Sequence, residues 1–204
     1  MIERKIDERL FERMVELGRG ITEAFRGFYL AGGAAITFKY RHRISTVLGF
    51  FSYHGFSPTR LHKRLSEMFP VEKWERGIDD ANFLIAGIKV SFVFFPFKNV
   101  KRTERVMGVR VASDYDLLLN KIYSAGRRID PKDPYDFAFL FINGRVVRDW
   151  DVLKADFERK FPHQSFEIYM GAILNLEDYP TLPPDTAAAL LDIKEDFLRW
   201  RGLR

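Results

Sequence analysis

Residues 28–52 read FYLAGGAAITFKYRHRISTVLGFFS, and this stretch predicts the fold of the chain. The apolar run 28–31 is typical of a buried strand. Gly32 and Gly33 follow it, and glycines allow a sharp turn and a close approach of the backbone to a neighbour. Residues 34–40 favour a helix, and residues 46–52 return as a second apolar strand. The stretch therefore predicts a strand, a glycine turn, a helix and a strand in succession.

The glycine pair has two interpretations. Glycines are common where a strand turns into a helix, because they let the helix pack closely on its neighbours. A helix that begins after a glycine pair also presents free N–H groups and the positive end of its dipole, which together bind a phosphate. Lys39, Arg41, His42 and Arg43 form a positive cluster at the end of this helix. From these residues alone, both interpretations stay open.

The order of the motifs resembles the nucleotidyltransferase-like family of AbiEii-type toxins, a branch of the polymerase-β-like superfamily. Members carry a segment close to LAGGTALAL and then HR-x-S-x-DLDFF. This chain has LAGGAAITF over residues 30–38 and HRISTVLGFF over residues 42–51. The resemblance implies that nucleotide phosphates bind at these two segments. The binding positions that it implies here are Gly32, Gly33, Arg41, His42, Arg43 and Ser45.

The chain departs from the family pattern at the metal ligands. Two aspartates of the family, which hold Mg²⁺ and clamp the triphosphate, fall on Val47 and Gly49. A third carboxylate tends to lie on a later strand, where Ser91 is the best match; a core serine bonded to backbone is an equally good explanation of that residue. Mg²⁺ needs oxygen ligands, and valine and glycine side chains supply none. The resemblance implies the fold, whereas the substitutions predict that the metal ligands are missing.

A second motif, KIYSAGRRIDPKDPYDFAFL, occupies residues 121–140. The family has a lysine and then KDxxD before an apolar helix, and Lys121, Lys132, Asp133 and Asp136 match this pattern. The resemblance implies that Lys121 and Lys132 hold phosphates, and that Asp133 and Asp136 position them or transfer protons. Asp133, Asp136 and Lys121 are therefore the candidate catalytic residues. A structural role also fits, because Asp133 before Pro134 is typical of a helix N-cap and Asp136 suits the dipole of the first turn.

The composition limits the class of protein. The chain of 204 residues has no cysteine, 20 phenylalanines and a net charge of +5. The lack of cysteine excludes disulfides and thiolate metal sites, and it suits a reducing, cytoplasmic environment. No apolar run reaches the roughly 18 residues of a membrane span, and the charged N-terminus does not look like a secretory signal. The modest basic excess is compatible with a nucleotide or nucleic-acid partner.

The remaining pattern predicts an α+β fold. We expect a nucleotidyltransferase-like mixed sheet of about four or five strands, with helices packed on it and a helical C-terminal half. Residues 1–112 form the α/β core with its N-terminal helix, and residues 113–204 form the helical region, packed as one compact unit. Residues 88–95 are nearly all apolar and predict a central strand that is buried on both faces. Ser57 and Ser113 are expected N-caps. Further helices are expected over 2–17, 58–69, 114–127, 150–161, 165–174 and 185–200, and further strands over 71–74, 82–86 and 109–112.

Three functions follow from these observations. The first is a protein that keeps a nucleotide- or phosphate-binding pocket but has lost nucleotidyl transfer, with no metal ligands and no certain cofactor. The second is an active, toxin-type transferase that modifies RNA or protein with a nucleoside monophosphate. It would hold Mg²⁺ through Asp133, Asp136 or another carboxylate, such as Asp79, Asp80 or Asp114. The third is an interaction module that binds RNA, or an antitoxin-like partner protein, through the basic residues of 60–64 and 98–105. None of the three requires a membrane.

Overall fold

The computed structural model describes residues 7–203, and these divide into two compact units. The sheet unit comprises residues 7–98 and 102–112. The helical unit comprises residues 99–101 and 113–203. The chain therefore passes between the units at residues 98–102 and again after residue 112.

The first helix, α1 (Glu8–Ala24), runs further than the predicted helix over 2–17, whose first five residues lie outside the described residues. Asp7 caps it by accepting hydrogen bonds from the N–H groups of residues 9 and 10. Gly18 and Gly20 lie inside the helix, beyond its expected end at residue 17, and both are sites of close packing. A Cβ atom on Gly18 would lie 3.4 Å from Val109, and one on Gly20 would lie 3.1 Å from Phe69.

The sheet is mixed and has seven strands in the order β3-β4-β5-β2-β1-β7-β6. It is larger than the expected four or five strands. Strand β7 lies within the expected strand over 109–112, whereas β6, a strand of three residues, lies where no strand was expected. Strand β1 pairs antiparallel with β2 and parallel with β7, and β2 pairs parallel with β5. The strands are β1 (Tyr29–Ala31), β2 (Val47–Ser52), β3 (Val71–Arg76), β4 (Asp80–Ile85), β5 (Ile88–Phe94), β6 (Glu104–Val106) and β7 (Val109–Val111).

The two faces of the sheet differ in exposure. Leu48, Phe50, Val90 and Phe92 point to one face and are fully buried. The opposite, open face carries the alternating residues of β2 and β5, which are exposed or half-buried. The expectation that residues 88–95 are buried on both faces is therefore wrong: only alternate residues of β5 are buried, and Lys89 is exposed. The run looked continuous because several apolar residues also occupy the open face.

Two further helices belong to the sheet unit. Helix α2 (Gly32–Tyr40) links β1 to β2, and helix α3 (Pro58–Met68) follows β2. The expected N-cap at Ser57 is confirmed, since its hydroxyl accepts a hydrogen bond from the N–H of Arg60. His62 of α3 stacks on Trp74 of β3, with ring centroids 4.5 Å apart. Helix α3 thus packs on the end of the sheet formed by β3 and β4.

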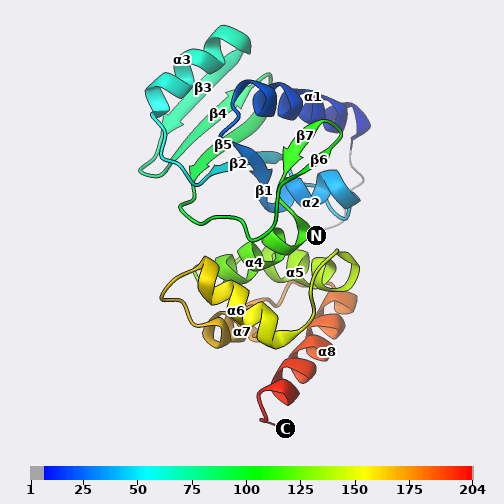
Figure 1. Ribbon diagram of the computed structural model, residues 1–204. Coiled ribbons are helices and arrows are strands. Elements are labelled where there is room, and N and C mark those ends of the chain that lie inside the picture. Colours follow the sequence, from blue (N-terminus) through cyan, green and yellow to red (C-terminus); the bar gives the residue numbers. More distant parts are fainter. Residues whose placement is uncertain (1–6, 204) are drawn as a thin grey trace. The chain divides into compact units, whose positions relative to one another are not determined.

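The helical unit has an aromatic core. Trp150, Phe157, Phe166 and Phe197 are buried and contact one another, with ring centroids between 5.4 and 6.5 Å apart. Figure 1 shows the helices of this unit gathered together, and every described strand in the sheet unit. The elements of the helical unit are α4 (Asp114–Ala125), α5 (Lys132–Asn143), α6 (Trp150–Lys160), α7 (Phe166–Ile173), the 3₁₀ turn η1 (Leu176–Asp178) and α8 (Pro184–Trp200). Within the described residues, no helix combines the length and the apolar character that crossing a bilayer requires.

Candidate functional site

The glycine turn joins β1 to α2. Gly32 has φ +65°, a left-handed conformation that favours glycine, although a Cβ atom there would meet nothing within 4 Å. Helix α2 begins at Gly32, two residues earlier than expected. Its N-cap residue, Ala31, makes no side-chain hydrogen bond to the helix. The first N–H groups of α2 therefore lack a side-chain cap, as the phosphate-binding interpretation requires.

Position 33 requires a glycine because neighbouring side chains occupy the space that a Cβ atom would fill. A Cβ atom at this position would overlap the guanidinium group of Arg43 and lie 3.3 Å from the hydroxyl oxygen of Ser45. The hydroxyl of Thr37 lies 2.9 Å from the carbonyl oxygens of both Gly33 and Arg43. The close-packing interpretation of the glycine pair is thus correct for Gly33. The same packing places a cation and a hydroxyl group beside the start of α2, so the two interpretations do not exclude each other.

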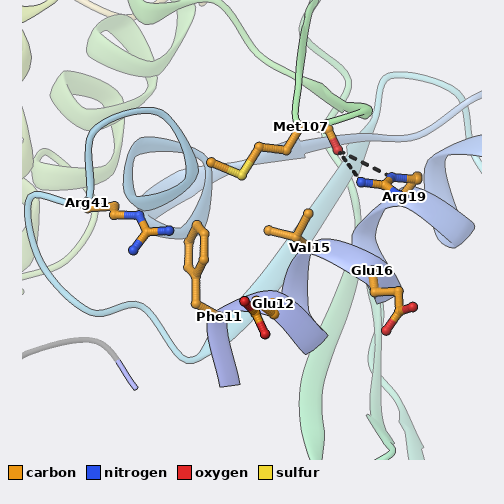
Figure 2. A pocket seen from close by; sticks show the side chains of 7 residues that line it. All are labelled: Phe11, Glu12, Val15, Glu16, Arg19, Arg41 and Met107. Atoms are coloured by element: carbon orange, nitrogen blue, oxygen red, sulfur yellow. Dashed lines mark hydrogen bonds between the residues drawn. The ribbon is translucent and has the colours of Figure 1, made fainter. Parts of the chain in front are cut away.

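The basic residues after α2 do not act as one cluster. Arg41 ends the helix with φ +52°, pairs with Glu8, and lies over the ring of Phe11 at 4.2 Å from its centroid. Figure 2 shows Arg41 and the ring of Phe11 among the side chains that line a cavity of about 410 Å³ beside α1. Lys39 pairs with Glu104 at 3.0 Å. Both cations lie at the C-terminal end of α2, about 13 Å from its start for a helix of nine residues.

Arg43 is the cation of this group that returns to the glycine turn. It is 7% exposed, and its Nη1 donates a hydrogen bond to the carbonyl oxygen of Ile44 at 3.0 Å. His42, between Arg41 and Arg43, is half-buried. Gly33, Arg43 and Ser45 are therefore the implied phosphate-binding residues that the structure brings together. The contacts of Arg41 give no support to its assigned role.

The three positions that the resemblance aligns with metal ligands, Val47, Gly49 and Ser91, lie together on the open face. Ala31 pairs with Gly49 across β1 and β2, and Gly49 pairs with Ser91 across β2 and β5. Ala31, Gly49 and Ser91 thus form a row across the sheet that starts beside the glycine turn. Val47 lies two residues before Gly49 on the same face. This is the neighbourhood that the resemblance implies for the metal ligands. The side chains present there do not fit Mg²⁺, because they supply one hydroxyl group and no carboxylate.

Other carboxylates do not rebuild the ligand set. Within residues 7–203, no group of three or more His, Cys, Asp or Glu residues is arranged to hold a metal ion. A carboxylate oxygen of Asp80 accepts a hydrogen bond from the Asn82 amide at 2.7 Å, and Asp114 accepts one from the backbone N–H of Arg145 at 2.9 Å. These two side chains make local contacts that stabilise a turn and a loop.

The second motif forms a buried ion network in the helical unit. The ammonium group of Lys121 lies 2.8 Å from a carboxylate oxygen of Asp133 and 2.7 Å from one of Asp136. Arg128 also donates to Asp133 at 2.9 Å, and this hydrogen bond raises the pKa of the guanidinium group. Both aspartates are fully buried. The network joins α4 to α5 and balances the charge of Lys121, so the contacts favour a structural role for this lysine, whereas Lys132 is exposed.

The expected N-cap at Asp133 is wrong. Helix α5 begins at Lys132, so Asp133 lies in its first turn with its side chain directed to Lys121 and Arg128. The carboxylate of Asp130 accepts the hydrogen bond from the N–H of Lys132 instead, at 3.0 Å. Pro134 is the third residue of α5, two positions beyond a helix-starting proline, and there too the helix leaves the backbone N–H without an intrahelical partner.

A second buried ion pair was not visible in the sequence. The expected N-cap at Ser113 is confirmed, because its hydroxyl accepts a hydrogen bond from the N–H of Asp116. The carboxylate of Asp116 also accepts from Lys160 at 2.7 Å and from the N–H groups of Val100 and Lys101 at 2.8 and 2.9 Å. Burial lowers the pKa of Lys160, and Asp116 opposes this effect. No local pattern links α4 with residue 160.

Comparisons with known proteins agree with the fold. No family model matches the chain. A relative in sequence is the uncharacterized protein aq_aa25 of Aquifex aeolicus, which is 26% identical over 181 residues, covering 86% of this chain and 84% of that protein.

Three solved structures resemble the chain, each with a TM-score of 0.57. The "putative nucleotidyltransferase from H. pylori" is 15% identical, with 91% of this chain and 92% of that chain covered. JHP933 from Helicobacter pylori is 13% identical, with 98% and 99% covered. An antigenic nucleotidyltransferase-like protein from Paracoccidioides brasiliensis is 13% identical, with 90% and 93% covered. The fold of this chain is therefore the α+β fold of nucleotidyltransferase-like proteins, with a mixed sheet and a helical C-terminal half.

Proposed function

We propose that this protein binds a phosphate group of a nucleotide at the glycine turn, without Mg²⁺, and does not transfer nucleotidyl groups. The observation that carries the proposal is the set of groups beside Gly33. The guanidinium of Arg43 and the hydroxyl of Ser45 lie against the start of a helix whose first N–H groups lack a side-chain cap. A cation, a hydroxyl donor and free N–H groups are the partners that a phosphate oxygen accepts hydrogen bonds from.

The loss of transfer follows from the side chains at the ligand positions. Two-metal catalysis places two cations close together to stabilise the attacking and leaving oxygens. Val47, Gly49 and Ser91 supply no carboxylate to hold them. Because no carboxylate occupies these positions, we expect a phosphate beside Arg43 to bind the protein without Mg²⁺ as a bridge.

The proposal is tested by nucleotide binding. Titration calorimetry with ATP, CTP, GTP and UTP, with and without Mg²⁺, should show binding of at least one nucleotide that Mg²⁺ does not enhance. Arg43→Met and Ser45→Ala should weaken it, because each removes a donor beside Gly33. Arg41→Met is the matched control, since this arginine contacts Phe11 at the other end of α2. Absence of binding by all four nucleotides at millimolar concentration would show that the proposal is wrong.

The alternative of an active transferase is tested in parallel. Incubation of the protein with labelled nucleotide, RNA and Mg²⁺ or Mn²⁺ should give no incorporation into RNA or protein. Divalent-dependent labelling would favour the toxin-type activity and would refute the loss of transfer. The variant Val47→Asp/Gly49→Asp/Ser91→Asp restores three carboxylates at positions that share one face. We expect it to gain Mg²⁺ binding that the unchanged protein does not show.

The finer placement among AbiEii-type proteins rests on the motifs alone. LAGG, HRIS and KDPYD occur in the family order, and we propose on this basis that the protein has a partner of the antitoxin type or an RNA ligand. The exposed cations Arg60, Lys63 and Arg64 of α3 suit an acidic partner. Salt-sensitive binding of RNA would support the RNA ligand, whereas co-purification of a folded acidic protein from the source organism would support a protein partner.

A further inference from the structure

The open face of the sheet carries a groove of about 470 Å³ that lies within the sheet unit. The side chains that define it come from four neighbouring strands. Their positions follow from the strand register. One row across the sheet contains Val47, Lys89, Leu84 and Lys73, because each of these residues pairs with the next. The adjoining row contains Gly49, Ser91, Asn82 and Glu75. The residues of these two rows that line the groove are Val47, Lys73, Glu75, Asn82, Leu84 and Lys89.

Two cations in this groove have no partner within the described residues. Lys73 and Lys89 are exposed and make no hydrogen bond or ion pair with residues 7–203. They flank Leu84 on neighbouring strands, so their Cα atoms are about 10 Å apart, which is two strand spacings. Unpaired lysines that face the same concave surface attract an anion, because each offers three N–H donors.

The floor of the groove is apolar and its far edge is polar. Val47 is 41% exposed, and Leu84 lies between the two lysines. Glu75, on the edge strand β3, has no partner within the described residues and accepts hydrogen bonds. A volume of about 470 Å³ lies within the range of roughly 300–1,000 Å³ that is usual for small-molecule sites. The groove therefore suits a small molecule with an apolar body and at least one anionic group.

We propose that this groove is a second ligand subsite that binds a nucleoside phosphate, with its phosphates at Lys73 and Lys89 and its base and ribose on Val47 and Leu84. The charge of the lysines selects the phosphates. The carboxylate of Glu75 accepts hydrogen bonds from ribose hydroxyl or base amino groups. The groove has no exposed aromatic ring on which successive bases could stack, since Trp74 stacks on His62 of α3, so a single nucleotide suits it better than a nucleic-acid strand.

The subsite adjoins the phosphate site of the proposed function, on which this inference in part rests. The row that begins at the glycine turn continues through Gly49 and Ser91, which have small side chains, to the rim of the groove at Asn82. No carboxylate separates the two sites along this row. Two phosphorylated ligands, or one ligand with phosphates at both ends, can therefore occupy the face together.

The test uses ATP in the absence of divalent ions, titrated against the full-length protein by calorimetry at low salt. The groove variant is Lys73→Met/Lys89→Met, which keeps the apolar stems and removes the charges. The variant at the glycine turn is Arg43→Met. The control is Arg60→Met/Lys63→Met, which removes two exposed positive charges from α3. We expect each lost lysine contact to weaken ATP binding in the groove about tenfold.

The outcomes separate the two proposals. Two equivalents of ATP, of which the groove variant loses one and Arg43→Met loses the other, would support both sites. One equivalent that both variants weaken would mean that one molecule spans the face, and would also support the groove. Binding of one equivalent of ATP that is lost only in Arg43→Met would refute the groove as a binding site and leave the proposed function intact. Loss only in the groove variant would overturn the glycine-turn site. If the control variant weakens ATP binding as much as the groove variant does, or if ATP does not bind at all, the groove is refuted as a binding site.

Discussion

Removal of the Asp116 carboxylate should destabilise the helical unit more than any surface change. Asp116 is fully buried and accepts hydrogen bonds from Lys160, from the Ser113 hydroxyl and from two backbone N–H groups. Asp116→Ala leaves the Lys160 ammonium, whose side chain is 0% exposed, without its counter-charge. Removing one partner of a buried ion pair costs about 3–5 kcal/mol. For a chain of this size, each kcal/mol lowers Tm by about 2–4 °C, so we expect a decrease of about 6–20 °C.

Urea and thermal unfolding followed by circular dichroism measure this change. Arg199→Ala is the control, because Arg199 and Asp196 are exposed and 3.9 Å apart, and such pairs contribute at most about 1 kcal/mol. The double variant Asp116→Ala/Lys160→Met should lose less stability than the sum of the single variants, since it leaves no buried charge unpaired. A decrease for Asp116→Ala no larger than that for Arg199→Ala would refute the reasoning.

The same variant has a predictable pH dependence. Burial lowers the pKa of Lys160 below its ordinary value of 10.5, and Asp116 opposes the shift. Without Asp116 the pKa in the folded state falls further, so the unfolded chain binds more protons than the folded chain as pH approaches 10.5 from below. The stability of Asp116→Ala should therefore rise with pH in that window more than the stability of the unchanged protein. Equal slopes would contradict the unpaired-lysine explanation.

Three further predictions concern single positions. Gly33→Ala should displace the Arg43 guanidinium, lower the free energy of unfolding by about 1–3 kcal/mol and weaken nucleotide binding; unchanged stability in urea would contradict the packing. Gly126→Ala should destabilise the chain by a similar amount, because its Cβ atom would overlap the ring of Tyr169. Tyr169→Ala also loses stability because the ring is buried, so a loss in Gly126→Ala/Tyr169→Ala smaller than the sum of the two single losses would confirm the clash, and additive losses would contradict it. Burial raises the pKa of Tyr179 from 10.0 to about 12. The free energy of unfolding should therefore fall by about 2–3 kcal/mol as pH rises between these values, and it should not fall in this way for Tyr179→Phe. Parallel curves of unfolding free energy against pH for the two proteins would exclude this contribution.

Local patterns in the sequence determined most elements and their ends. The glycine turn, the strands on either side of it and the N-caps at Ser57 and Ser113 were predictable, because each depends on residues within one turn or one strand. The helical C-terminal half followed from apolar periodicity. Strand β6 was not predicted, since three residues carry little pattern and such a strand forms only by pairing with a neighbour, whereas β7 lies within the strand expected over 109–112.

Tertiary structure alone decided the partners of the charged residues. Asp133 looked like a cap in the sequence, yet it pairs with Lys121, which is 12 residues away, and Asp116 pairs with Lys160, 44 residues away. The cations Arg41 and Arg43 are two residues apart in sequence, but they lie at opposite ends of α2. Arg41 stays at the C-terminal end and contacts Phe11, whereas the guanidinium of Arg43 lies beside Gly33 at the N-terminal end. The reason is physical: a hydrogen-bonding pattern within a turn is local, whereas burial and ion pairing depend on which distant segments the fold brings into contact.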